Sequence, residues 1–141
     1  MINDGLNLKG KLAISLNGQV VREVDNIVVT AGKGYVASRM KDATATAMSH
    51  MAIGSGTTNP AAGDTALETE LGRVALTSTA VSNAVVTYTA TFAAGTGTGA
   101  VTEAGILNAS SSGTLLCRTE FSVVNKGSAD SMTITWTVTV S

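Results

Sequence analysis

The side chains best suited to chemistry are few in this sequence and lie far apart. There is one histidine, His50, and one cysteine, Cys117. His50 alternates with apolar neighbours in MSHMAIG and has no cysteine, aspartate or second histidine at metal-ligand spacing, so a structural or exposed strand histidine is favoured. Cys117 lies in the apolar run TLLCRTEF, which is typical of a buried, reduced core residue.

Four glutamates form two pairs that resemble acid–base pairs: Glu68 with Glu70, and Glu103 with Glu120. Catalytic carboxylates need opposed and unequal environments, and sequence spacing alone does not supply them. Solvated charges or ion pairs with Arg73 or Arg118 are favoured instead. No nucleophile-elbow motif accompanies the abundant hydroxyls. The sequence therefore predicts no catalytic residue, and a protein that is not an enzyme.

Two glycine-rich stretches resemble nucleotide-binding loops only in part. GTGTGA, residues 95–100, is followed by a strand pattern where a dinucleotide loop must open a helix. In AGKGY, Lys33 is followed by Gly34 where a phosphate loop needs Ser or Thr, and Ile27 stands where its first glycine should be. We interpret these segments as a loop and a helix entry. No cofactor-binding or metal-ligating residue is predicted.

The composition argues against several classes of partner. Charged residues make up 13% of the 141 residues and the net charge is −1, so no basic stripe is available for direct contact with nucleic acid. The opening MINDGLNLKG has the pattern of neither a signal peptide nor a membrane anchor, and we expect synthesis and folding in a reducing cytoplasm. A weakly charged surface is easily desolvated, which favours contacts between subunits.

The first half of the chain mixes strands with short helices. LAISL and QVVREV flank Asn17-Gly18, which predicts a β-hairpin. A helix is expected at about residues 30–41, with Thr30 as its cap. ATATAMSHMAIGSG reads as a strand and TTNPAAG as a loop. A second short helix through ALETELG is expected to begin at Asp64 or Thr65.

The second half of the chain reads as β structure throughout. Five strands are expected: RVALTSTAV, AVVTYTATF, AVTEAGILNA, GTLLCRTEFSVV and the strand that ends the chain. The last strand alternates Ser and Thr with apolar residues from Ser131 to Ser141, so one face is a hydroxyl ladder. Trp136 lies on its apolar side and is predicted in the core, and we expect this strand to be interior to its sheet.

These patterns predict a mainly β protein: an antiparallel β-sandwich or barrel with one or two short helices and an N-terminal hairpin. A single domain is expected over residues 1–141. Within it, residues 1–47 hold the hairpin and a helix, a candidate contact region, and residues 48–141 form the sandwich core.

Several motifs resemble a β-rich structural module of tailed-bacteriophage virion proteins. They are the segments AIGSGTT, LETELGR, TEAGILNA and LLCRTEF…NKGSADSMTITWTV, within about residues 48–141. The resemblance implies a structural subunit without catalysis, found in small decoration or cement proteins and in tail-fibre-like proteins. No coiled-coil or repetitive shaft is present, which favours a small subunit over a long fibre.

The expected function is a capsid decoration or cement protein that stabilises the assembled shell, located in the virion and made in the cytoplasm of a host bacterium. Its partner would be the major capsid protein. The alternative is a tail, neck or short tail-fibre component that binds tail or neck proteins. A carbohydrate-binding β-sandwich remains a third reading, although one Trp, two Tyr and two Phe supply few sugar platforms. We expect a homo-oligomer, with a trimer favoured, that buries part of the threonine face.

Overall fold

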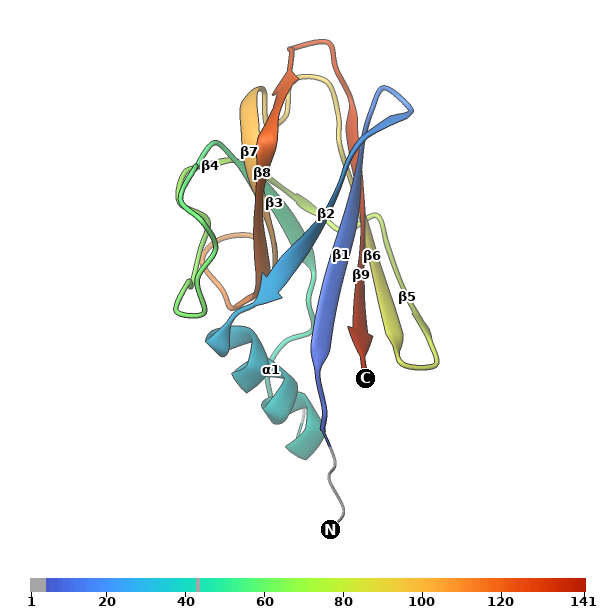
Figure 1. Cartoon of the computed structure of the whole chain (residues 1–141), viewed down its shortest axis with the longest axis vertical. Helices are drawn as coiled ribbons and strands as arrows, with labels where there is room; N and C mark the ends of the chain where they lie inside the picture. Colours follow the sequence, from blue (N-terminus) through green and yellow to red (C-terminus); the bar gives the residue numbers. More distant parts are fainter. Residues whose placement is uncertain (1–4, 43) are drawn as a thin grey trace.

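The structure is a computed structural model that describes residues 5–42 and 44–141, and strands dominate it (Figure 1). The elements follow in the order β1 (Leu8–Leu16), β2 (Gln19–Val28), α1 (Thr30–Lys41), β3 (His50–Gly54), β4 (Glu70–Ala75), β5 (Ser78–Ser82), β6 (Val85–Phe92), β7 (Gly99–Leu107), β8 (Leu115–Lys126) and β9 (Met132–Val140).

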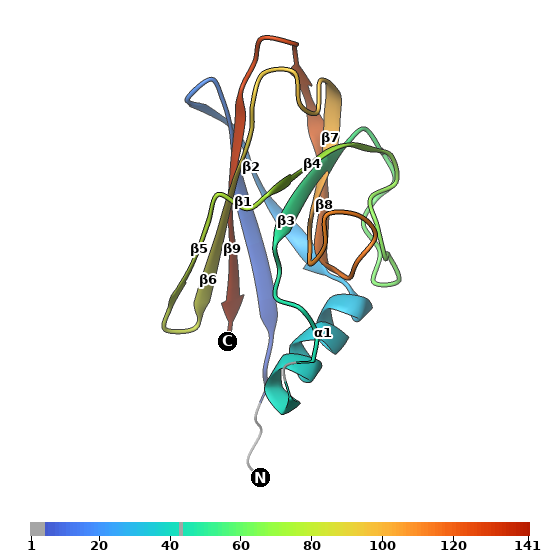
Figure 2. The same ribbon diagram turned by 180° about the vertical axis from the view of Figure 1, so that it is seen from behind.

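The nine strands form one curled antiparallel sheet with the order β4-β3-β7-β8-β2-β1-β9-β6-β5. Only two residue pairs join β2 to β8, so the sheet bends sharply there and its two halves face each other. The views from both sides show α1 at one end of this half-barrel (Figures 1 and 2). The predicted class, a mainly β antiparallel sandwich or barrel, is confirmed.

The N-terminal hairpin lies in the middle of the sheet. Asn17 and Gly18 take positive φ angles of 51° and 86°, as the predicted turn requires. β1 pairs with β9 along its whole length, and β2 leads into the other half of the sheet. Where β2 diverges from β8, Arg22 bridges the gap by donating to the carbonyls of Ser122 and Val123. The hairpin therefore connects the two halves of the core.

The core contains the apolar side of β9, as predicted. Trp136 is fully buried, and its indole Nε1 donates to Asn26 Oδ1 at 2.6 Å. In the strand register, Trp136 stands between Leu12 of β1 and Tyr88 of β6. The prediction that the last strand is interior to its sheet is also confirmed, because β9 pairs on both sides.

Helix α1 has the predicted bounds, but its predicted cap is wrong. Val29 is the N-cap residue and makes no side-chain capping bond, while Thr30 is the first helical residue. The Thr30 N–H instead donates to the carbonyl of Ala62 at 2.8 Å, so a neighbouring loop satisfies this end. Gly32 lies against β8, where a Cβ atom would stand 2.1 Å from Leu116 O. This close approach explains why the helix carries a glycine in its first turn.

The second expected helix, at Asp64 or Thr65 through ALETELG, is wrong. Residues 64–69 are bends and irregular backbone, and β4 begins at Glu70. The backbone N–H groups of Glu68 and Thr69 donate to the carboxylate of Glu103, which fixes this segment in a non-helical shape.

Two predicted strands differ in length from the observed ones. RVALTSTAV is divided, because β4 ends at Ala75 and β5 begins at Ser78. The two pieces lie at opposite edges of the sheet, so the chain must cross from one half of the sheet to the other between them. The strand expected over residues 43–56 is limited to β3, residues 50–54, and residue 43 lies outside the described residues.

Candidate functional site

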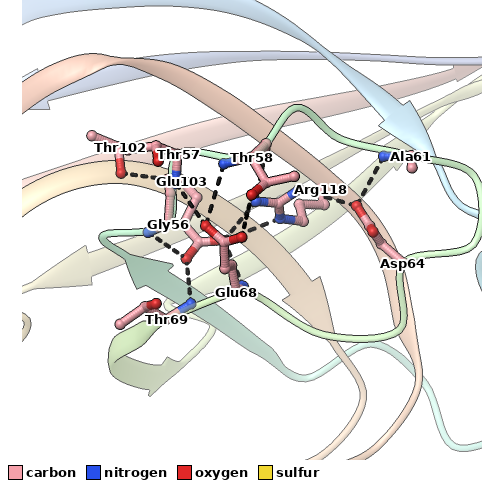
Figure 3. Close-up of polar contacts among 10 residues, drawn as sticks. All are labelled: Gly56, Thr57, Thr58, Ala61, Asp64, Glu68, Thr69, Thr102, Glu103 and Arg118. Carbon is pink, nitrogen blue, oxygen red and sulfur yellow. Dashed lines mark hydrogen bonds and ion pairs between the residues drawn. The ribbon is translucent and has the colours of Figure 1, made fainter.

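A buried cluster of charged side chains holds the segment between β3 and β4, residues 55–69, which we call the clamped loop (Figure 3). Glu103 on β7 is its centre and is completely buried. Its Oε2 accepts from the backbone N–H of Gly56 at 2.8 Å and of Thr69 at 2.7 Å, and its Oε1 accepts from that of Glu68 at 2.9 Å. One carboxylate thus ties together the two ends of the loop.

Arg118 on β8 neutralises this carboxylate and extends the cluster. Its Nε donates to Glu103 Oε1 at 3.0 Å. Its Nη1 pairs with Asp64 Oδ2 at 3.0 Å, and its Nη2 donates to the carbonyl of Thr58 at 3.0 Å. The guanidinium is therefore held in a fixed fork, which satisfies a buried charge and also pins the middle of the clamped loop.

A third carboxylate, that of Glu68, accepts hydrogen bonds at the surface of the cluster. Glu68 Oε1 accepts from the backbone N–H of Thr57 at 2.8 Å, and its other oxygen accepts from the hydroxyl of Thr58. The hydrogen bond from the Thr58 side chain, followed by those from the Thr57 and Thr58 backbone, lowers the pKa of Glu68 below its usual value.

Two glycines make the close approach of loop and carboxylate possible. A Cβ atom on Gly56 would lie 2.5 Å from Glu103 Oε2, and one on Gly54 would lie 2.3 Å from the carbonyl of Thr69. Any larger residue would displace the backbone from the carboxylate. Close packing in this site thus explains why the motif AIGSG contains two glycines.

The cluster fixes the shape of the clamped loop and leaves its outer part exposed. All the hydrogen-bonding partners of Glu103 are donors from the fold itself, so its oxygens face no solvent. Among the described residues there is no group of three or more His, Cys, Asp or Glu side chains able to hold a metal ion. The outer part of the clamped loop, from Thr57 to Ala62, is mainly exposed. The cluster therefore holds this exposed part of the loop in a fixed conformation.

The ion pairs expected from the sequence are present for both arginines. Arg73 pairs with Glu70 at 2.7 Å, and Arg118 pairs with Glu103. Glu120 lies opposite Glu103 in the register of β7 and β8 but makes no ion pair among the described residues. Sequence reasoning missed Asp64, which it assigned to a helix cap. It also missed the complete burial of Glu103, because the neighbouring residues in the sequence do not indicate that a charged side chain is buried.

The lone histidine and the lone cysteine occupy the places expected of them. His50 lies on β3, partly buried, with its Nδ1 2.7 Å from the hydroxyl of Ser49. Cys117 is a free, completely buried thiol, and burial raises its pKa. Neither residue belongs to the cluster.

An apolar groove lies between α1 and the end of the sheet. Its volume is about 320 Å³, and Tyr35, Val36 and Met40 of α1 form one wall. Tyr88 and Val138 belong to the opposite wall. Burial raises the pKa of Tyr88 to about 12. The groove includes no residue of the charged cluster.

The hydroxyl ladder forms the outer face of two adjacent strands. Seven threonines alternate on them: Thr87, Thr89 and Thr91 on β6, and Thr133, Thr135, Thr137 and Thr139 on β9. The register sets them side by side, and the hydroxyls of Thr91 and Thr133 are 3.0 Å apart. This array, which we call the threonine face, carries no charged residue on either strand.

Comparison with known protein families, with curated proteins and with solved structures found no match to this chain. The resemblance to phage virion modules therefore stays a prediction from the sequence motifs. In the described residues no helix combines the length and apolar character needed to cross a membrane.

Proposed function

We propose that this chain is a non-enzymatic structural protein of a tailed-phage virion, and specifically a decoration or cement protein that stabilises the assembled capsid shell. The observation that carries the proposal is the threonine face. Its seven threonines are regular and uncharged, and desolvating them on contact costs less than desolvating charged side chains. Lys9 and Lys11 of β1, opposite Thr139 and Thr137, border the face on one side. The clamped loop adds a second, rigid surface.

Stabilisation of the shell follows from mass action. A protein that binds the assembled lattice and not its free subunits shifts the equilibrium toward the lattice. Many copies, or one oligomer that spans several shell subunits, add their contacts through multivalency. We expect a homo-oligomer, with a trimer favoured, that buries part of the threonine face between copies or against the major capsid protein.

Part of the contact was expected within residues 1–47. Residues 1–4 and 43 of this region lie outside the described residues. β1 and β2 are strands of the sheet itself, so the exposed parts able to meet a partner are α1, the turn at Asn17-Gly18 and the outward side chains of the two strands, such as Lys11 and Val20. A test of this region must leave β1 intact, because Leu8 already pairs with Val140.

The proposal is tested by co-sedimentation of the purified full chain with genome-free heads and, separately, with tails. Binding to heads is expected. Binding to tails alone would favour the tail, neck or short-fibre alternative. Binding to neither, together with retention on an immobilised glycan, would overturn the virion proposal in favour of a carbohydrate-binding module.

A paired set of variants shows whether the threonine face makes the contact. Thr135→Lys with Thr137→Lys places two charges on the face and should abolish co-sedimentation at low salt. Val123→Lys with Asn125→Lys adds the same two charges at exposed positions of β8, in the other half of the sheet, and should bind like the unaltered protein. Full binding by the first variant would show that the threonine face is an ordinary solvent face.

A further inference from the structure

The two edges of the sheet differ in how they are protected. β4 ends the sheet on one side and carries the ion pair between Glu70 and Arg73. Its pairing with β3 shifts register at one end, and Gly72 lies so close to Gly97 that a Cβ would stand 3.0 Å from it. Charges, a register shift and a covering loop are devices that keep an edge from pairing with another chain.

The opposite edge, β5, has none of these devices. All five residues from Ser78 to Ser82 are exposed, and Val81 has 73% of its surface accessible. The strand contains no charged residue and no proline, and it pairs with β6 in unbroken register. Figures 1 and 2 both show it at the outer rim, on the far side of the sheet from α1.

The open side of β5 has backbone groups to satisfy. In an antiparallel ladder every second residue of an edge strand directs its N–H and C=O away from its only neighbour. Among the described residues, no side chain forms a hydrogen bond with residues 78–82. An added strand would supply the missing partners, as in recognition by β-strand addition.

We propose that β5 pairs with β5 of a second copy of this chain, antiparallel and about a twofold axis through Ala80. The five-residue strand is self-complementary in this register. Ala80 faces its own copy, Ser78 faces Ser82, and Thr79 faces Val81. Small residues meet on one face of the joined sheet and β-branched residues meet on the other, which favours cross-strand packing without any repulsion between like charges.

The contact is small, and its size sets the conditions under which it forms. Five residues of extended chain span about 17 Å, so the paired strands bury much less surface than the roughly 1,200–2,000 Å² of a stable free complex. Pairing therefore needs a high local concentration. The proposed function would supply this by anchoring copies side by side, but the self-pairing of β5 itself does not rest on that function. A twofold contact joins copies in pairs and is distinct from one that closes a trimer.

Disulfide trapping tests the pairing and its register in the full chain. In the proposed register, the two copies of residue 80 have Cα atoms about 4.5–5.5 Å apart, within the range that a disulfide spans. Ala80→Cys should therefore form a covalent dimer under mild oxidation when the protein is highly concentrated. The native Cys117 is buried and remains in place as an unreactive thiol.

The matched control is Ser82→Cys, on the same exposed strand. In the same register its two copies would be about 14 Å apart, so this variant should give at least about tenfold less dimer, because its rate reflects random collisions alone. A mixture of Thr79→Cys and Val81→Cys chains should form the mixed dimer in preference to either like pair.

Equal yields from Ala80→Cys and Ser82→Cys would overturn the proposal, as would the absence of a covalent dimer from both. Circular dichroism of each variant establishes that the fold is retained, and all four positions are exposed. Co-sedimentation with heads or tails is measured independently with the unaltered chain, so the self-pairing of β5 and the virion function can each fail without the other.

Discussion

Glu103 and Arg118 lie diagonally across from each other on neighbouring strands, 15 residues apart in the sequence, with Arg118 Nη2 3.0 Å from Glu103 Oε1. Their side chains are 0% and 2% exposed. Burying two charges is costly unless both are fully hydrogen-bonded, and here the remaining groups bind the clamped loop through its backbone and through the Asp64 carboxylate. The ion pair therefore links the core of one half of the sheet to the shape of an exposed surface.

Removal of the charge on Glu103 should destabilise the fold. Glu103→Gln leaves Arg118 buried with a weakened partner, and we expect a loss of about 3–5 kcal/mol in the free energy of unfolding. Urea unfolding followed by Trp136 fluorescence measures the effect. Glu120→Gln, opposite on β8, is the control and should change stability by less than about 0.5 kcal/mol. Equal effects would contradict a special role for the cluster.

The same variant should loosen the clamped loop before the whole protein unfolds. Glutamine keeps only one acceptor oxygen, and its NH2 group must face either the N–H groups of Gly56 and Thr69 or the donors of Glu68 and Arg118. Either mismatch raises the population of locally open states. We expect limited proteolysis within residues 57–66 to be faster in Glu103→Gln than in Glu120→Gln under conditions where both remain folded. Identical cleavage rates would show that the loop keeps its shape without the carboxylate.

The same substitution at two glycines of α1 should change the stability of the fold in opposite directions. Gly32→Ala would place a methyl group 2.1 Å from Leu116 O and must displace the helix, so we expect a loss of stability and a change in the apolar groove. Gly34→Ala meets nothing within 4 Å and should stabilise the helix by about 0.5–1 kcal/mol. Thermal unfolding by circular dichroism compares the two, and stabilisation by both would contradict the close packing of α1 on β8.

Trp136 should contribute through both its volume and its indole N–H. Trp136→Ala is expected to cost about 3–5 kcal/mol through lost burial and a cavity. Trp136→Phe should cost less stability than Trp136→Ala. It should still cost more than the smaller ring volume alone would predict, because Asn26 Oδ1 loses its donor in a buried setting. Denaturation followed by circular dichroism measures both variants. In the unaltered protein, a fluorescence maximum typical of an exposed indole would contradict the burial.

Asp130 should make stability depend on acid pH. A hydrogen bond from the Asn17 side chain, with one from the Gly127 N–H, lowers its pKa below the ordinary 3.8. A group with a lowered pKa in the folded state stabilises the fold above its unfolded pKa and loses that effect as the pH falls through the folded value. The stability difference between the unaltered protein and Asp130→Asn should therefore be full above pH 3.8 and vanish at lower pH.

The control for this pH dependence is Asp25→Asn, an exposed aspartate whose carboxylate makes no hydrogen bond among the described residues. Chemical denaturation at a series of pH values should show no comparable decrease, toward acid pH, in the stability difference between this variant and the unaltered protein. A difference for Asp130→Asn that persists unchanged in acid would indicate that the turn is held by contacts other than its carboxylate.

Local patterns predicted most of the elements of this fold. The Asn-Gly turn, the helix at residues 30–41 and the alternating strand of Trp136 depend on backbone preferences and side-chain period, which act over a few residues. Each of these is confirmed with its predicted register or bounds. The sequence by itself also determined the class, because alternation repeated through the second half of the chain leaves few alternatives to a curled antiparallel sheet.

Only the tertiary structure decided the role of Glu103 and the shape of residues 55–69. A helix was expected there because Asp64 or Thr65 suits a helix N-terminus locally, but a carboxylate 34 residues further along takes the N–H of Thr69. The division of β4 from β5 was likewise decided by where each strand finds a partner, at opposite edges of the sheet. Such hydrogen bonds join residues far apart in the chain, and a local window contains only one of the two partners.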